Sequence, residues 1–130
     1  MRLLKMRRRK PLEKTYIDVN VLYYYLTASE EHGEKSKDYI SAYSGRLVTS
    51  TLTIWILHVL TQLENLTSIM EEIGVELVPL TVHILFEAER LKKPRELEDR
   101  IHLSTMNYLG IKRIISNDRD FDLPGIERLF

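Results

Sequence analysis

Short apolar runs alternate along the chain with longer segments of helical periodicity, and this alternation constrains the fold most strongly. We expect strands at residues 15–19, 46–49, 75–78 and 112–116. Helical segments separate them, at about residues 21–27, 34–43, 51–65, 68–73, 81–92 and 96–108. Strands joined through helices form a parallel sheet by right-handed crossovers, and the helices cover both faces of that sheet. The sequence therefore predicts an α/β fold with three layers, α/β/α, and a central parallel sheet of four to five strands.

The basic residues are concentrated at the N-terminus. The chain has 130 residues, which is the size of one domain. Residues 1–10 hold six of the 19 Lys and Arg side chains and no acidic residue. We therefore expect a flexible basic arm at residues 1–14 and one domain at residues 15–130. The arm either contacts a phosphate backbone through salt-sensitive charge interactions or is a solvated tail, in which case Met6 is an alternative start.

The composition excludes several classes of protein. The chain has no cysteine, so it contains neither disulfides nor thiolate zinc sites, and this agrees with a cytoplasmic location. No apolar run approaches the roughly 20 residues that span a bilayer, so no membrane partner is expected. A nucleophile elbow of the GxSxG type and a glycine-rich phosphate loop are both absent from the sequence.

Three aspartates stand where an α/β domain places its ligands. Asp18 closes the first predicted strand, Asp118 follows the last one, and Asp99 opens the helix at residues 96–108. Ligands of such sheets bind beyond the carboxyl ends of the strands, at the point where the strand order reverses. Carboxylates buried there are costly unless they are paired, and Mg²⁺ or Mn²⁺ prefers oxygen ligands. The pattern predicts a divalent metal site and metal-dependent hydrolysis of phosphodiester bonds.

Each of these residues also has a purely structural interpretation. Asp18 can cap a helix, and Asp99 is favoured in a first helical turn by the helix dipole whatever its function. Asp118 can serve as a turn former. His102 lies three residues after Asp99 on the same helix face, so it either approaches the site or packs as a hydrogen-bonded core residue.

Several segments resemble, in order and spacing, the PIN-domain family, which contains small metal-dependent ribonucleases that include VapC-type toxins. The resemblance covers residues 15–130. The segments that carry it are residues 16–20, 47–50, 98–105 with Gly110, and 116–121. They are similar to the opening strand with its first aspartate, the second strand, the acidic helix start with its glycine, and the final acidic turn.

The resemblance implies a set of functional residues. Asp18, Asp99 and Asp118 are implied as catalytic residues that bind Mg²⁺ or Mn²⁺. A further metal contact is implied for Asp120, or for Asp122 through water. Supporting roles are implied for Asn20, Ser50 and Asn117. The implied activity is that of an endoribonuclease that hydrolyses RNA with a metal-activated water, as the toxin of a type II toxin–antitoxin pair. A cognate antitoxin and a homodimer are the implied protein partners.

One part of the family pattern is missing. The family has a glutamate about six residues past the serine that corresponds to Ser50, and this chain has Ile56 there, with no carboxylate in residues 51–60. Glu64 does not replace it, because eight further residues of helix displace a side chain by about 12 Å and roughly 80°. A catalytically degenerate PIN-fold protein that binds RNA or assembles with another protein is therefore the alternative. A receiver-like or nucleotide-binding module is a third interpretation, supported by fold class alone.

Overall fold

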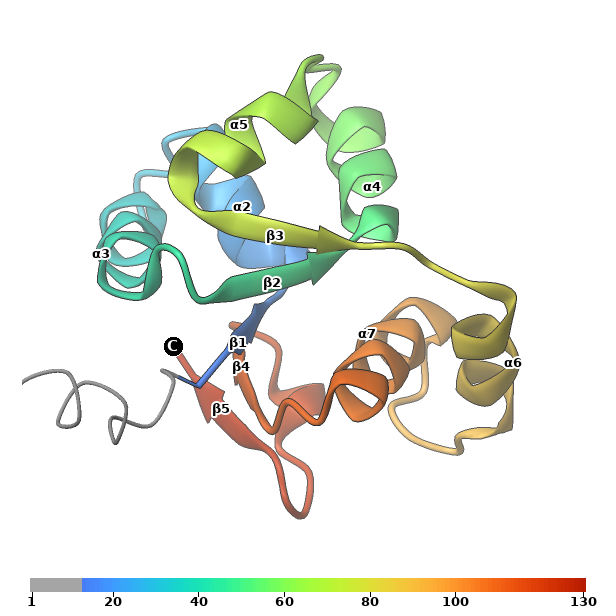
Figure 1. Ribbon diagram of the computed structural model, residues 1–130. Coiled ribbons are helices and arrows are strands. Elements are labelled where there is room, and N and C mark those ends of the chain that lie inside the picture. The colour runs from blue at the N-terminus through green and yellow to red at the C-terminus, as the bar shows by residue number, and fades with distance from the viewer. Residues whose placement is uncertain (1–12) are drawn as a thin grey trace, which may run out of the picture.

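Five parallel strands form one sheet in the computed structural model, which describes residues 13–130 (Figure 1). Residues 1–12, most of the predicted basic arm, lie outside the described residues. The strands are β1 (Thr15–Ile17), β2 (Leu47–Ser50), β3 (Val75–Val78), β4 (Arg113–Ile115) and β5 (Glu127–Leu129). Their order across the sheet is β3-β2-β1-β4-β5. The predicted parallel sheet of four to five strands is confirmed.

Helices connect the strands, and some of them begin at residues whose side chains cap them. They are α2 (Val19–Leu26), α3 (Gly33–Tyr43), α4 (Thr51–Thr61), α5 (Leu66–Ile73), α6 (Val82–Arg90), α7 (Leu97–Leu109) and the 3₁₀ turn η1 (Arg119–Phe121). Ser50 caps α4, and Thr81 caps α6, each by accepting a backbone N–H with its hydroxyl. Gly110 ends α7 in the left-handed conformation, with φ of 70°, as its position in the sequence predicts.

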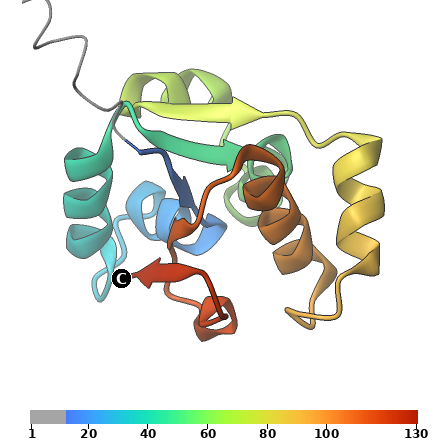
Figure 2. The same ribbon diagram turned by 60° about the horizontal axis from the view of Figure 1, so that its bottom comes forward.

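Neighbouring residues of each central strand face opposite sides of the sheet, and this builds two cores. Ile17, Leu47 and Ile115 belong to the core under α2, α3, α4 and α5. Tyr16 and Ile114 belong to the other core, under α7. Helix α6 packs on α7 and lies outermost on that side (Figure 2). The three predicted layers are therefore present.

Some boundaries differ from those predicted. The first helix begins at Val19 rather than at about residue 21 and is capped by Asp18, so Asn20 lies inside it. Helix α4 ends at Thr61 because Gln62 adopts a left-handed conformation. Residues Glu127–Leu129 pair with β4 as the parallel edge strand β5, which was not predicted.

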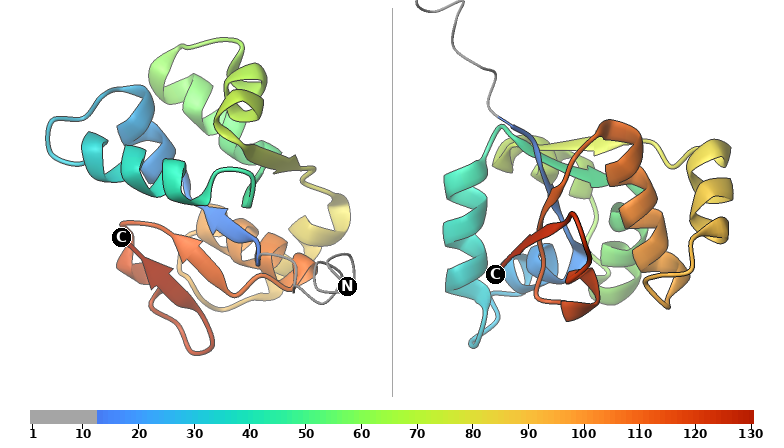
Figure 3. Two further views of the ribbon diagram at one scale, coloured as in Figure 1. Left: turned by 60° about the vertical axis from the view of Figure 1, so that its left-hand side comes forward. Right: turned by 90° about the horizontal axis from the view of Figure 1, so that it is seen from below.

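Strand β1 is the central strand, and the sheet extends from it on both sides. The first half adds β2 and β3 on one side, and the second half adds β4 and β5 on the other (Figure 3). The strand order therefore reverses between β1 and β4, where both strands end at the same edge. Among residues 13–130, no helix has the length and apolar character needed to cross a membrane.

Candidate metal centre

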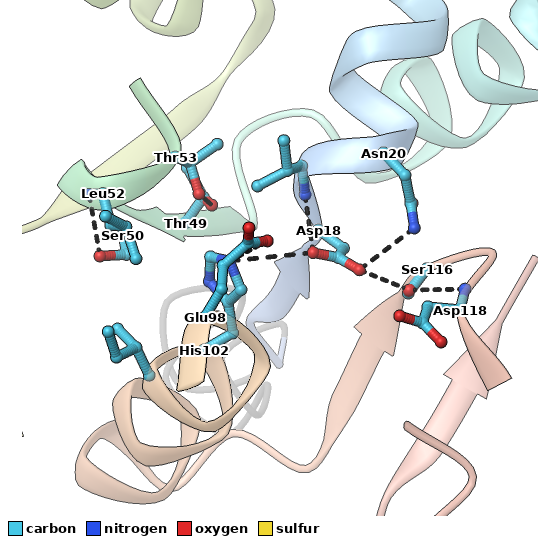
Figure 4. A network of polar contacts seen from close by, with 12 residues as sticks. Asp18, Asn20, Thr49, Ser50, Leu52, Thr53, Glu98, His102, Ser116 and Asp118 are labelled. Carbon is cyan, nitrogen blue, oxygen red and sulfur yellow. Dashed lines mark hydrogen bonds and ion pairs between the residues drawn. The ribbon is translucent and has the colours of Figure 1, made fainter. Parts of the chain in front are cut away.

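A small acidic pocket lies at the edge where β1 and β4 end. Its volume is about 210 Å³, and the carboxylates that line it are those of Asp18, Glu98, Asp99 and Asp118. They come from the end of β1, the first turn of α7 and the loop after β4 (Figure 4). No Lys or Arg from the described part of the chain lines the pocket. Asp18, Asp99 and Asp118, which are far apart in the sequence, thus lie together in one pocket as predicted.

Asp18 is buried and held by three hydrogen bonds. Its side chain is 3% exposed. Oδ1 accepts the backbone N–H of Val19 at 2.8 Å, and Oδ2 accepts Ser116 Oγ at 2.7 Å and Asn20 Nδ2 at 3.3 Å. Burial raises the pKa of Asp18, although the nearby His102 and these hydrogen bonds oppose the rise. Asp18 therefore both caps α2 and presents a carboxylate to the pocket.

Ser116 couples Asp18 to the loop that carries Asp118. Its hydroxyl donates to Asp18 and accepts the backbone N–H of Asp118 at 3.0 Å. Asp118 in turn caps the turn η1, since its Oδ1 accepts the N–H of Asp120 at 2.9 Å. These bonds fix the position of Asp118 relative to the end of β1.

Asp99 is buried, with 7% of its surface exposed, and lies among other carboxylates. Its pKa is raised to about 7, first by burial and then by the negative charges of Asp18, Asp118 and Glu98. A group of carboxylates crowded in this way, with no basic side chain from the described residues lining the pocket, is the oxygen-donor set that a divalent cation fits. The residues present therefore fit the ion that the sequence predicts.

The raised pKa of Asp99 predicts how the stability of the metal-free protein depends on pH. The folded state binds a proton more tightly than the unfolded state, so this group's contribution to stability falls as pH rises from about 4 to about 7. The melting temperature of the metal-free wild type should thus drop between about pH 5 and pH 7 by more than that of Asp99→Asn. Thermal melts in EDTA measure this difference, and equal drops in the two proteins would contradict it.

His102 and Glu98 both lie beside Asp18, which the sequence alone did not establish. His102 is fully buried, as a core histidine would be, yet its Nε2 lies 3.9 Å from Asp18 Oδ1. Glu98 was not among the predicted site residues, and its Oε2 lies 3.6 Å from the same nitrogen. The signal that identifies Glu98 is its spacing of four residues from His102, which puts both side chains on one helix face.

The predicted supporting residues lie at different depths. Asn20 lines the pocket and donates to Asp18. Ser50 does not line it, because its hydroxyl caps α4, but its backbone N–H donates to Tyr16 Oη at 3.1 Å. Asn117 also lies outside the lining and donates its amide to Tyr24 Oη at 3.1 Å.

The two further aspartates after β4 are placed differently from each other. Carboxylate oxygens of Asp99, Asp118 and Asp120 lie within 4.8 Å of one another, so Asp120 is close enough to share a cation with the other two. Asp122 instead accepts Arg128 Nε at 2.8 Å. Its charge is therefore engaged away from the pocket.

Ile56 lines the acidic pocket. The position at which the sequence lacks a glutamate thus faces the carboxylates, and its side chain provides apolar surface and no ligand atom.

A larger hollow of about 820 Å³ lies at the opposite edge, where the strands begin. Its carboxylates, Glu13 and Glu127, both pair with Arg113, at 3.1 and 3.3 Å. Because these charges are already compensated, the acidic pocket is the better candidate for a cation.

Comparisons with known proteins find a family model that covers most of the chain and solved structures with a similar fold. The family model described as PIN domain matches residues 15–126. No curated protein matches the sequence.

Solved structures of similar fold include a toxin, a toxin–antitoxin complex and a protein–DNA complex. VapC20 of Mycobacterium tuberculosis, described as a toxin that cleaves the sarcin–ricin loop, has a TM-score of 0.70 at 12% identity, covering 84% of this chain and 93% of that chain. A toxin–antitoxin complex from Klebsiella pneumoniae has a TM-score of 0.68 at 18% identity, covering 87% and 95%. VapBC2 from Rickettsia felis, bound to a DNA fragment from its promoter, has a TM-score of 0.62 at 10% identity, covering 88% and 96%.

Proposed function

The chain belongs to the PIN domain family, and from this membership we propose that it is a metal-dependent endoribonuclease. The observation that carries the proposal is the convergence of Asp18, Asp99 and Asp118 on one pocket that no basic side chain of residues 13–130 lines. These three carboxylates would hold Mg²⁺ or Mn²⁺, with Asp120 assisting. The ion, when bound, supplies an activated water and offsets the negative charge that develops on the phosphate.

The residues around the carboxylates keep them in place. Ser116 and the N–H of Val19 fix both oxygens of Asp18, so the carboxylate faces the pocket in one orientation. Asn20 donates to Asp18 and accepts the N–H of Asn117 at 3.3 Å, which joins the start of α2 to the loop after β4. Such supporting bonds hold ligands in a productive geometry before the substrate arrives.

We propose RNA as the substrate and a cognate antitoxin as the partner, with the protein acting in the cytoplasm as the toxin of a type II pair. The fold it shares with the M. tuberculosis toxin and with the two complexes supports this role. A homodimer belongs to the same proposal. The antitoxin would act by binding near the acidic pocket and excluding RNA from it.

A second candidate function is that of a PIN-fold protein without catalysis, retained for RNA binding or protein assembly. The observation that favours it is Ile56, which presents an apolar side chain to the pocket where the family pattern has a glutamate. In that case the remaining carboxylates would bind a divalent ion weakly or not at all.

One experiment separates the two functions. The wild type is titrated with Mn²⁺ by calorimetry, and its cleavage of a mixed RNA substrate is followed with Mn²⁺ and with excess EDTA. A working nuclease should show saturable binding and cleavage that EDTA stops. Absence of both binding and cleavage would contradict the nuclease and leave the binding protein as the function.

A further inference from the structure

We propose that Glu98 and His102 complete the cation site beside Asp18, in place of the glutamate that position 56 lacks. The inference rests on the proposed function, since it concerns the same pocket and the same kind of ion. It goes beyond the three aspartates by assigning a fourth carboxylate and a nitrogen ligand that the family pattern does not supply.

Glu98 is placed to act as the fourth carboxylate. It lines the same pocket as Ile56, but it enters from α7 rather than from α4. One ligand atom each from Asp18, Glu98 and His102 lie within 4.8 Å of one another. The Glu98 side chain is 44% exposed, so it can adjust to an ion without repacking the core. A carboxylate thus reaches the pocket although Ile56 supplies none.

His102 provides the independent observation that points to a ligand. Its side chain is fully buried, and its Nε2 has no hydrogen-bond partner among residues 13–130. Buried polar atoms are nearly always paired, so an unpaired one calls for a partner. Nε2 faces the carboxylates of Asp18 and Glu98 at 3.9 and 3.6 Å, distances too long for hydrogen bonds (Figure 4). A cation between these groups would satisfy all of them.

The other ring nitrogen of His102 is held as in a metal-binding histidine. Nδ1 lies 2.6 Å from Tyr16 Oη, and that hydroxyl also accepts the backbone N–H of Ser50. Histidines that bind metals commonly hydrogen-bond through the second nitrogen, which fixes the orientation of the ring. Tyr16 is itself fully buried, so the ring has little freedom to turn away from the pocket.

The nitrogen ligand has a consequence for the choice of ion. Mg²⁺ favours oxygen ligands and gives up its waters reluctantly, whereas first-row transition metals accept imidazole readily. A site that includes His102 should therefore favour Mn²⁺ over Mg²⁺. The neighbouring group of Asp99, Asp118 and Asp120 offers oxygen alone.

The test is Mn²⁺ binding by calorimetry to the wild type, Glu98→Gln, Glu96→Gln and Asp118→Asn. Glu98→Gln should weaken binding by about 10-fold or more. Glu96→Gln is the matched control, because it removes one charge at the start of the same helix from a residue that does not line the pocket. It should leave binding within about twofold.

Pulsed electron paramagnetic resonance of bound Mn²⁺ tests the nitrogen directly. The wild type should show coupling to ¹⁴N of an imidazole, and His102→Gln should lose it while its circular dichroism stays that of a folded protein. The double variant Glu98→Gln with Ile56→Glu should regain most of the Mn²⁺ affinity that Glu98→Gln alone loses, because both positions line one pocket.

The outcomes separate this inference from the proposed function. Wild-type affinity in Glu98→Gln, together with loss in Asp118→Asn, overturns the assignment of Glu98 and leaves the nuclease standing. Absence of ¹⁴N coupling in the wild type overturns the assignment of His102. No recovery in the double variant overturns the replacement of position 56 by Glu98. Absence of Mn²⁺ binding in the wild type overturns the proposed function itself.

Discussion

Asp18→Asn and Asp118→Asn should each reduce metal-dependent RNA cleavage by about 100-fold or more, which corresponds to a loss of about 3 kcal/mol of transition-state stabilisation. The physical reason is the charge of the site. Asparagine keeps the size of the side chain but removes the negative charge and one oxygen that would hold the ion. Cleavage of a labelled RNA in Mn²⁺, followed at equal protein concentrations, measures the effect.

Both variants should remain folded, so the loss can be assigned to the site. Burial raises the pKa of Asp18, which means that its ionised form is costly in the metal-free protein and that a neutral amide relieves this cost. Asparagine also caps helices well, so Asp118→Asn keeps the start of η1. An amide nitrogen cannot accept the hydrogen bonds that Val19, Asn20 and Ser116 donate to Asp18, and this loss offsets part of the gain in Asp18→Asn. The melting temperatures of the metal-free variants should therefore stay close to that of the wild type.

Asp122→Asn is the control for these two variants. Asp122 lies four residues after Asp118 but pairs with Arg128, and it does not line the pocket. Its replacement should leave cleavage close to that of the wild type. Wild-type cleavage by both Asp18→Asn and Asp118→Asn would show that the acidic pocket is not the active site.

Phe121→Ala should have the largest effect on stability, lowering the free energy of unfolding by about 3–5 kcal/mol. Phe121 is fully buried at the end of η1 and packs in the core formed with Tyr16, Ile114 and Met106. Truncation to alanine removes apolar contacts and leaves a cavity. Domains of this size are stable by only about 5–15 kcal/mol, so the loss is a large share of the total. Urea denaturation monitored by circular dichroism measures it.

The exposed residue Val82 provides the comparison for Phe121. It is 85% exposed on α6, so Val82→Ala should change the free energy of unfolding by no more than about 0.5 kcal/mol. Equal effects of the two substitutions would contradict the assignment of Phe121 to the core. Because Phe121 is attached to the turn that Asp118 caps, its loss should also loosen the acidic loop.

The order of the elements was predictable because it depends on local signals. The runs that became β1, β2, β3 and β4 are short, apolar and bounded by turn residues, and the segments between them show helical periodicity. Strand β5 gave no such signal, since Glu127–Leu129 is half exposed and gains its strand conformation by pairing with β4. The same holds for the end of α4, which depends on a left-handed Gln62.

The site was predictable only in part. Asp18, Asp99 and Asp118 stand at strand ends and a helix start, and such positions gather at one edge of any parallel sheet. Glu98 and His102 carried a weaker signal, because helix spacing tells which residues share a face but not which way that face points. Asp122 resembled Asp120 in sequence, and only its pairing with Arg128 separates the two.

The sequence by itself determined the α/β class, the parallel sheet and the edge at which the carboxylates collect, because strand and helix patterns and chain connectivity decide these. The tertiary structure alone decided which side chains share the pocket. The packing of α7 on β2 and of α6 on α7 sets the rotation of α7 about its axis, and that rotation brings Glu98 and His102 beside Asp18. The packing of α4 likewise directs Ile56 into the same pocket. Helix rotation results from contacts distant in sequence, so no local pattern encodes it.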